Sequence, residues 1–198
     1  MTINPADKGW LSVPGIRPTG DRTLEEQMLG LEKALAECAG KSVLDIGCAE
    51  GLIGREFARA GARRVVGLEL LASHIEVARE ACKDHPQMEF IVSHLGTWAA
   101  KHPQPERFDI VLALGVIHKL KDLKPGLVWA ARSAGDLLCF RSPAYTEPVD
   151  ADYYVHAKYG GDKVNVPATM REEGFVDEGK QTPGPRGEMV QYWRRVVV

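Results

Sequence analysis

Residues 42–51 read S-V-L-D-I-G-C-A-E-G, an apolar run that gives way at once to small residues. The run at residues 43–46 predicts a short buried strand, and residues 52–60 predict a helix directly after the small residues. Small side chains let a backbone approach a ligand closely, and the first amides of a helix have no partners within that helix. The stretch therefore predicts a strand, a tight ligand-binding turn and a helix.

A second predicted strand ends in an acidic residue. Residues 65–68 read V-V-G-L and predict a buried strand that terminates at Glu69. A carboxylate at this place suits the two hydroxyls of a ribose. A glycine-rich turn alone is equally typical of an ordinary strand-to-helix connection, whereas the added acid favours a nucleoside-containing ligand.

These residues resemble the first motif of the class I S-adenosylmethionine-dependent methyltransferases, which runs acid-x-Gly-x-Gly-x-Gly. The motif positions are occupied here by Asp45, Gly47, Ala49 and Gly51. Alanine thus replaces the middle glycine, and Glu69 stands where the family keeps its ribose-binding acid. The alternative is a nicotinamide-dinucleotide site, but such sites usually lack an acid like Asp45 inside the strand before the glycines.

The resemblance implies an α/β fold with a Rossmann-like, seven-stranded and mostly parallel sheet. The expected strand order is 3-2-1-4-5-7-6, with strand 7 antiparallel to the others and helices on both faces. A predicted antiparallel hairpin near the end of the chain, at residues 175–193, supplies the last two strands. The resemblance then extends over about residues 41–198, apart from the tyrosine-rich loop.

The resemblance also implies S-adenosyl-L-methionine as the cofactor and S-adenosyl-L-homocysteine as its product. In the family an acid often follows the third strand and contacts adenine, but this chain has Ser93 and His94 there, so the adenine contact is open. The expected cofactor-binding residues lie in or after the first four sheet strands: Asp45, Gly47, Cys48, Ala49, Gly51, Glu69, Leu70, Ser93, His94 and Leu114.

The run F-D-I-V-L-A-L-G-V-I-H-K-L at residues 108–120 resembles the fourth motif of the same family, whose residues after strand 4 border the transferable methyl group. A general base matters only if the acceptor is a hydroxyl or a protonated amine. Histidine has a suitable pKa, and His118 and His156 are therefore the candidate catalytic residues. The alternative for His118 is a residue that only lines the pocket.

We expect one domain because 198 residues suit a single α/β core. Residues 1–22 predict an irregular N-terminal arm, and residues 23–198 predict the methyltransferase-like domain. Thr23 and Glu26 form a predicted capping box at the start of a helix that runs to Gly40. An insertion at about residues 144–167, rich in tyrosine, predicts a lid or a substrate-binding element.

The charge and composition of the sequence favour some classes of binding partner over others. The net charge is −2 without a basic stripe, which favours a small-molecule acceptor over nucleic acid. No apolar run is long enough to cross a membrane, and the N-terminus does not resemble a secretory signal, so we expect a cytoplasmic protein. The four cysteines lie far apart, which argues against a zinc site and against a disulfide framework.

The sequence therefore predicts an S-adenosylmethionine-dependent methyltransferase that acts on a small molecule by in-line methyl transfer. A second hypothesis is a non-catalytic protein of the same fold that binds the donor or a protein partner. An RNA methyltransferase is a third, which the charge balance disfavours. The sequence predicts no metal site, and it leaves the acceptor atom and the oligomeric state open.

Overall fold

The computed structural model describes residues 9–142, 154–158, 162–178, 182–185 and 188–196. The strands are β1 (Gly9–Leu11), β2 (Gly20–Arg22), β3 (Ser42–Ile46), β4 (Arg64–Glu69), β5 (Met88–Val92), β6 (Phe108–Leu114), β7 (Ala134–Ser142), β8 (Tyr154–His156), β9 (Lys163–Asn165), β10 (Phe175–Asp177), β11 (Thr182–Pro183) and β12 (Met189–Arg195). The helices are α1 (Leu24–Met28), α2 (Glu32–Ala36), α3 (Leu52–Arg59), α4 (Ala72–Ala81), α5 (Leu95–Lys101), the 3-10 helix η1 (Ile117–Lys119), α6 (Leu123–Ser133) and α7 (Val166–Glu172).

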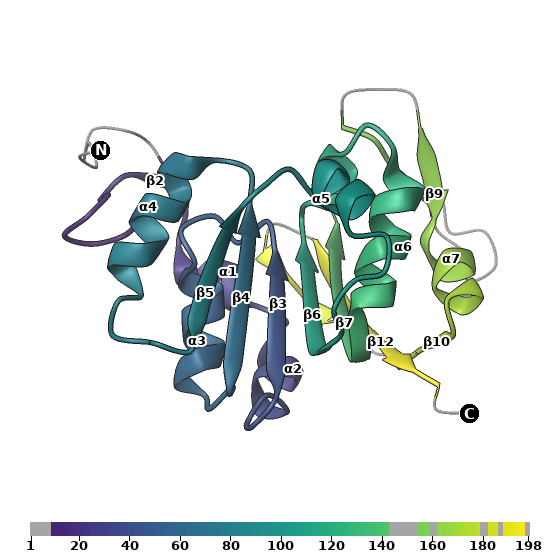
Figure 1. Ribbon diagram of the computed structural model, residues 1–198, viewed down its shortest axis with the longest axis horizontal. Coiled ribbons are helices and arrows are strands. Elements are labelled where there is room, and N and C mark those ends of the chain that lie inside the picture. The colour runs from purple at the N-terminus through teal and green to yellow at the C-terminus, as the bar shows by residue number, and fades with distance from the viewer. Residues whose placement is uncertain (1–8, 143–153, 159–161, 179–181, 186–187, 197–198) are drawn as a thin grey trace.

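The main sheet has the strand order β5-β4-β3-β6-β7-β12-β10 (Figure 1). Numbered from β3 along the chain, this is the expected order 3-2-1-4-5-7-6, which is confirmed. β12 runs antiparallel to both of its neighbours on this path, β7 and β10, as expected for the seventh strand. The short strand β11 pairs with the start of β12 and is an eighth strand that the sequence does not predict.

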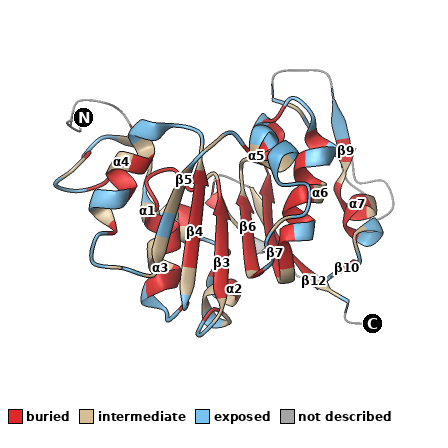
Figure 2. Ribbon diagram, in the orientation of Figure 1, coloured by how far each residue is buried: buried red, intermediate tan, exposed pale blue. Residues whose placement is uncertain are grey.

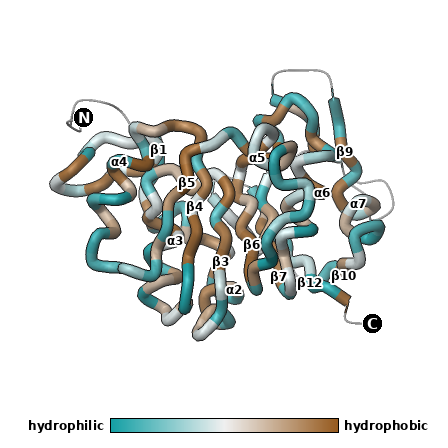
Figure 3. The backbone as a smooth tube through the Cα atoms, viewed as in Figure 1, coloured by the Kyte–Doolittle hydropathy of each residue, from teal (hydrophilic) through white to brown (hydrophobic). Residues whose placement is uncertain are grey.

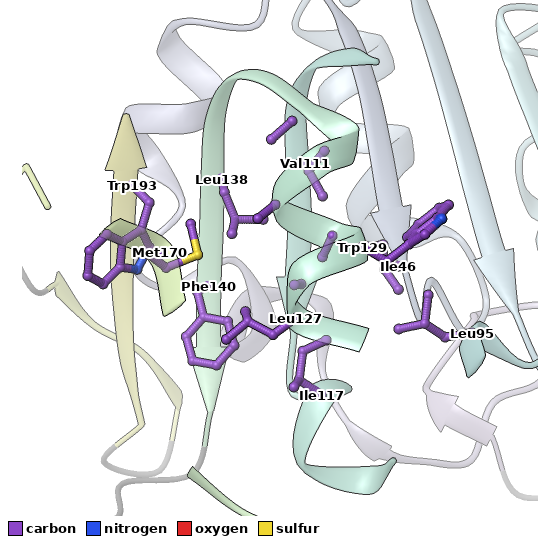
Figure 4. Packing of buried hydrophobic residues seen from close by; sticks show 14 of the residues in the cluster. Ile46, Leu95, Val111, Ile117, Leu127, Trp129, Leu138, Phe140, Met170 and Trp193 are labelled. Carbon is purple, nitrogen blue, oxygen red and sulfur yellow. The ribbon is translucent and has the colours of Figure 1, made fainter. Parts of the chain in front are cut away.

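Side chains of the sheet alternate between two cores on its opposite faces, as the period of two in a strand requires. Val43 of β3 packs in the core beneath α2 and α3, whereas its neighbour Leu44 packs in the core beneath α5, α6 and α7. Figure 4 shows part of the second core, where Leu127 of α6, Phe140 of β7 and Met170 of α7 come together. Helices therefore cover both faces, as expected.

The central strands β3, β4, β6 and β7 are buried along most of their length (Figure 2) and carry the most apolar stretches of the backbone (Figure 3). Strands covered on both faces read as continuous apolar runs, which is why these strands are recognisable in the sequence. β5 is the edge strand, and its side chains are intermediate or exposed. The sheet thus holds the ends of β3, β4 and β6 rigidly around one point.

The single helix predicted from Thr23 to Gly40 is wrong, because the chain forms two short helices, α1 and α2, in its place. Gly30 between them has a φ of 81°, a left-handed conformation that breaks a helix. The predicted capping box is confirmed: the Thr23 side chain accepts from the Glu26 amide, and the Glu26 side chain accepts from the Thr23 amide. Where the sequence predicts an irregular arm, residues 9–22 contain the parallel pair β1 and β2.

The predicted lid at residues 144–167 falls largely outside the described residues. Its described portions include β8 and β9, which form an antiparallel hairpin, and the first residues of α7. Val155 and Val164 of this hairpin are buried in the same core as α6 and α7. A role of this segment as a lid stays a prediction.

All four cysteines are buried and unpaired, so none forms a disulfide. Across the described ranges we find no helix with the length and apolar character that crossing a membrane requires. The same ranges contain no group of three or more His, Cys, Asp or Glu side chains placed to hold a metal ion.

Candidate functional site

A cavity of about 340 Å³ lies where β3, β4, β5 and β6 end. Ligands of open α/β sheets bind at this edge, outside the carboxyl ends of the parallel strands. Residues from all four strand ends line the cavity, and Trp10 of β1 lines it from the N-terminal segment. Segments far apart in the sequence thus meet at one site.

The loop after β3 enters this cavity through left-handed backbone conformations. Gly47 has a φ of 77°, and a Cβ there would lie 3.1 Å from Val116 Cγ2. Ala49 has a φ of 48°, the single non-glycine residue among those described with a positive φ. This conformation costs an alanine about 1–2 kcal/mol, which explains why the resembling family keeps a glycine at that position. Gly51 serves packing, because a Cβ there would lie 2.8 Å from the Phe90 ring.

Glu69 is fixed at the end of β4 by two backbone amides. Its Oε2 accepts a hydrogen bond from the Ala49 amide at 3.1 Å, and its Oε1 accepts from the Leu71 amide at 2.9 Å. The carboxylate is half-buried on the cavity wall. Each of its oxygens keeps a second lone pair, so the carboxylate fits two ribose hydroxyls as further donors.

Asp45 is almost completely buried and lies behind the cavity instead of in its wall. The Gly54 amide of α3 donates to its carboxyl, while Oδ2 has no hydrogen-bond partner among the described residues. Burial and the charge of Glu69 raise the pKa of Asp45 from 3.8 to about 7, against the lowering effect of Arg141. The sequence predicts that the first amides of α3 are free to bind a ligand. The Gly54 amide is not free, because it donates to Asp45.

Asp45→Asn is expected to flatten the pH dependence of stability. Between pH 3.8 and about 7 the folded carboxyl keeps a proton that the unfolded chain has lost, so the contribution of Asp45 to stability falls as pH rises. From pH 5 to pH 8 we expect the wild type to lose roughly 3 kcal/mol relative to Asp45→Asn, at about 1.4 kcal/mol per pKa unit. Urea unfolding of both proteins at the two pH values measures this difference, and parallel pH profiles would contradict it.

Glu50 is a buried carboxylate to which the sequence pattern assigns no role. Its oxygens accept hydrogen bonds from the Trp10 amide at 2.9 Å and from the Leu11 amide at 2.8 Å, and Arg17 Nη1 lies 3.4 Å away. His74 Nε2 lies 3.7 Å from the same carboxylate. Glu50 thus ties β1 to the loop after β3 and holds Trp10 at the cavity.

Lys119 and Trp10 face each other at the end of the cavity formed by the β6 loop. Lys119 Nζ lies 4.7 Å from the centroid of the Trp10 ring, and both residues line the cavity. Burial and the charge of Lys158 lower the pKa of Lys119. Neither residue is among the site residues that the sequence predicts.

The two candidate catalytic histidines do not line this cavity. His118 is buried, and desolvation, followed by the charges of Lys119 and Lys158, lowers its pKa to about 4. A histidine with this pKa is neutral at pH 7 but a weak base. His156 lies in β8 with an exposed side chain. A catalytic role for either histidine stays a prediction.

Most of the expected cofactor-binding residues come together. Seven of the ten line the cavity, namely Gly47, Ala49, Glu69, Leu70, Ser93, His94 and Leu114. Asp45, Cys48 and Gly51 lie outside the lining, where they support the loop from behind. His94 also caps α5 by accepting from the Gly96 amide, so its ring is positioned by the fold.

The strand order and the cavity at the strand ends together give the Rossmann-like architecture that the sequence predicts. Residues 43–133, a little under half of the chain, match the model of a family described as "Methyltransferase domain". Among solved structures, the chain resembles magnesium protoporphyrin IX methyltransferase from Synechocystis PCC 6803 with bound S-adenosylhomocysteine. That likeness has a TM-score of 0.63 and 17% identity, and it covers 83% of this chain and 78% of the other. At this identity it shows the shared fold.

Two curated relatives match shorter stretches. The ubiquinone biosynthesis O-methyltransferase of Klebsiella pneumoniae is 36% identical over 84 residues, which is 42% of this chain and 34% of the relative. The ribosomal protein L11 methyltransferase of Aeromonas hydrophila is 30% identical over 102 residues, which is 52% of this chain and 34% of the relative. The chain therefore spans about a third of the length of each of these relatives.

Proposed function

We propose that this chain is an S-adenosylmethionine-dependent methyltransferase that acts on a small-molecule acceptor. The observation that carries the proposal is the cavity wall itself, where Glu69 and the loop of Gly47 and Ala49 meet at the ends of β3 and β4. The match of residues 43–133 to a methyltransferase domain supports the same reaction class. The name of the O-methyltransferase relative supports a small-molecule acceptor.

The residues of the site would act mainly by positioning. Bound S-adenosylmethionine would supply a methyl group activated by its positive sulfur. Glu69 would hold the ribose, and the loop of Gly47 and Ala49 would bring its backbone close to the donor. Trp10 would cover the cavity and exclude water, because the Glu50 hydrogen bonds hold β1 over it. Such alignment is the main requirement of an in-line displacement.

Calorimetry and label transfer test this proposal. We expect saturable one-to-one binding of S-adenosylmethionine and of S-adenosylhomocysteine to the purified chain. Donor labelled on its methyl group, incubated with a cell extract, is expected to transfer label to the small-molecule fraction, not to RNA or protein. If neither S-adenosylmethionine nor S-adenosylhomocysteine binds, the proposal is rejected. Label in RNA or protein would show that the acceptor belongs to that class of molecule instead.

A donor-binding protein without catalysis is the second candidate. Two observations favour it: Ala49 replaces a glycine in a left-handed conformation, and Ser93 and His94 replace the acid that the resembling family often places after this strand. Binding of both nucleosides without any transfer of label would support this candidate. We also propose a cytoplasmic location, in keeping with four unpaired cysteines.

A further inference from the structure

Lys119 is a cation that the proposed reaction does not use. It lies at the end of the cavity beside the loop after β6, and its Nζ is 4.7 Å from the centroid of the Trp10 ring. Among the described residues, no carboxylate lies within ion-pair distance of Lys119. The ammonium group therefore contacts an aromatic face at a place where a ligand has access to it.

Arg22 of β2 is a second cation on the same ring. Its Cζ lies 5.3 Å from the centroid of the Trp10 ring. Its Nε and Nη1 are buried and have no hydrogen-bond partner among the described residues. Arg22 does not line the cavity, so Lys119 is the cation of this pair that a ligand in the cavity reaches.

The charge distribution of the cavity indicates which ligand brings that anion. Glu69 lies at the β4 side, where it suits the ribose, and Lys119 lies at the β6 side. Burial and then the charge of Lys158 lower the pKa of Lys119, and the charges of Glu69 and Glu188 oppose this to a smaller extent. A bound donor would add the positive charge of its sulfonium to the cavity. An acceptor with a negative charge would balance these cations, whereas a cationic acceptor would be repelled.

We propose that Lys119 binds a carboxylate of the methyl acceptor, so that the acceptor is an acidic small molecule. Trp10 lines the cavity beside Lys119, and its ring adds an aromatic surface to the wall there. This inference rests on the proposed methyltransferase function and specifies its substrate class.

Anion-exchange separation of the labelled products tests the substrate class. After incubation of the protein with methyl-labelled donor and a small-molecule extract, we expect the labelled product to be retained by an anion exchanger at pH 7. Lys119→Met keeps the apolar stem and is expected to lower label transfer at least tenfold, while Lys119→Arg restores most of it. Labelled product in the unretained fraction, or full transfer by Lys119→Met, would overturn the inference and leave the methyltransferase function standing.

Donor binding distinguishes the acceptor from the donor as the source of the carboxylate. We expect S-adenosylhomocysteine to bind Lys119→Met and the wild type with affinities within threefold, which also shows that the variant is folded. Methylthioadenosine lacks the amino-acid carboxylate of S-adenosylhomocysteine. If Lys119→Met loses tenfold or more in affinity for S-adenosylhomocysteine but keeps its affinity for methylthioadenosine, Lys119 binds the donor and the inference fails. Absence of label in every product of the wild type would instead reject the methyltransferase function.

Discussion

Replacing Glu50 with alanine is expected to lower the free energy of unfolding by about 3–5 kcal/mol, because it removes one partner of a buried ion pair. Arg17 would stay buried without its carboxylate, and the amides of Trp10 and Leu11 would lose their acceptors. β1 is then expected to leave the cavity. Urea denaturation measures the loss of stability, and hydrogen exchange of the Trp10 and Leu11 amides reports the release of β1.

The matched control is Glu172→Ala at the end of α7. Glu172 pairs with Lys124 at 3.0 Å, but both side chains are more than half exposed, so we expect a loss of at most about 1 kcal/mol. Glu50→Gln keeps the shape and one acceptor oxygen and should fall between wild type and Glu50→Ala. If Glu50→Ala behaves like the Glu172 control and its two amides stay protected, Glu50 does not anchor β1.

Glu69→Ala is expected to weaken the binding of S-adenosylhomocysteine by at least about a hundredfold. Two ribose hydroxyls donating to one carboxylate form charge-assisted hydrogen bonds of about 1.5–3 kcal/mol each, and 1.4 kcal/mol corresponds to a tenfold change. The variant also removes the acceptor that the Ala49 amide uses at 3.1 Å, which loosens the loop after β3. Isothermal titration calorimetry measures the change directly.

A thermodynamic cycle separates the ribose contact from loosening of the loop. Methylthioadenosine and its 2′-deoxy analogue should differ in affinity for the wild type but bind Glu69→Ala almost equally. Glu80→Ala is the control, because Glu80 lies exposed on α4 and pairs with Lys83 at the surface. Its affinity for the nucleosides should stay unchanged. If the two analogues still differ in the Glu69 variant by as much as in the wild type, Glu69 does not contact the ribose hydroxyl that they differ in.

Much of the fold was predictable because its central strands are buried on both faces. The run at residues 108–120, which resembles the fourth motif of the family, begins with β6 at Phe108–Leu114. The break between α1 and α2 was not predicted, since the apolar residues on either side of Gly30 keep helical spacing. The spacing of apolar residues shows which face of a helix is apolar. Whether the helix continues past a glycine depends on tertiary packing.

The site was predictable where it follows strand ends and unpredictable where it depends on contacts over a long sequence distance. The sequence predicts Glu69 as a site residue because an acid at the end of the second sheet strand is a pattern that a short stretch of sequence shows. Trp10 and Lys119 meet only through the fold, and nothing in either neighbourhood predicts that the two side chains contact each other. Glu50 was missed because its partners lie about forty positions away, as the hydrogen bond to the Trp10 amide shows.

The sequence by itself determined the positions of the central sheet strands, the loop of Gly47 and Ala49, and the acid that faces it, since all of these depend on residue type and spacing within short stretches. Only the tertiary structure decided that Asp45 and Cys48 support the loop from behind, and that Glu50 holds Trp10 at the cavity. The physical reason is that burial and hydrogen bonding are properties of neighbours in space. A carboxylate in a glycine-rich loop can face a ligand or the protein, and only the packed chain determines which.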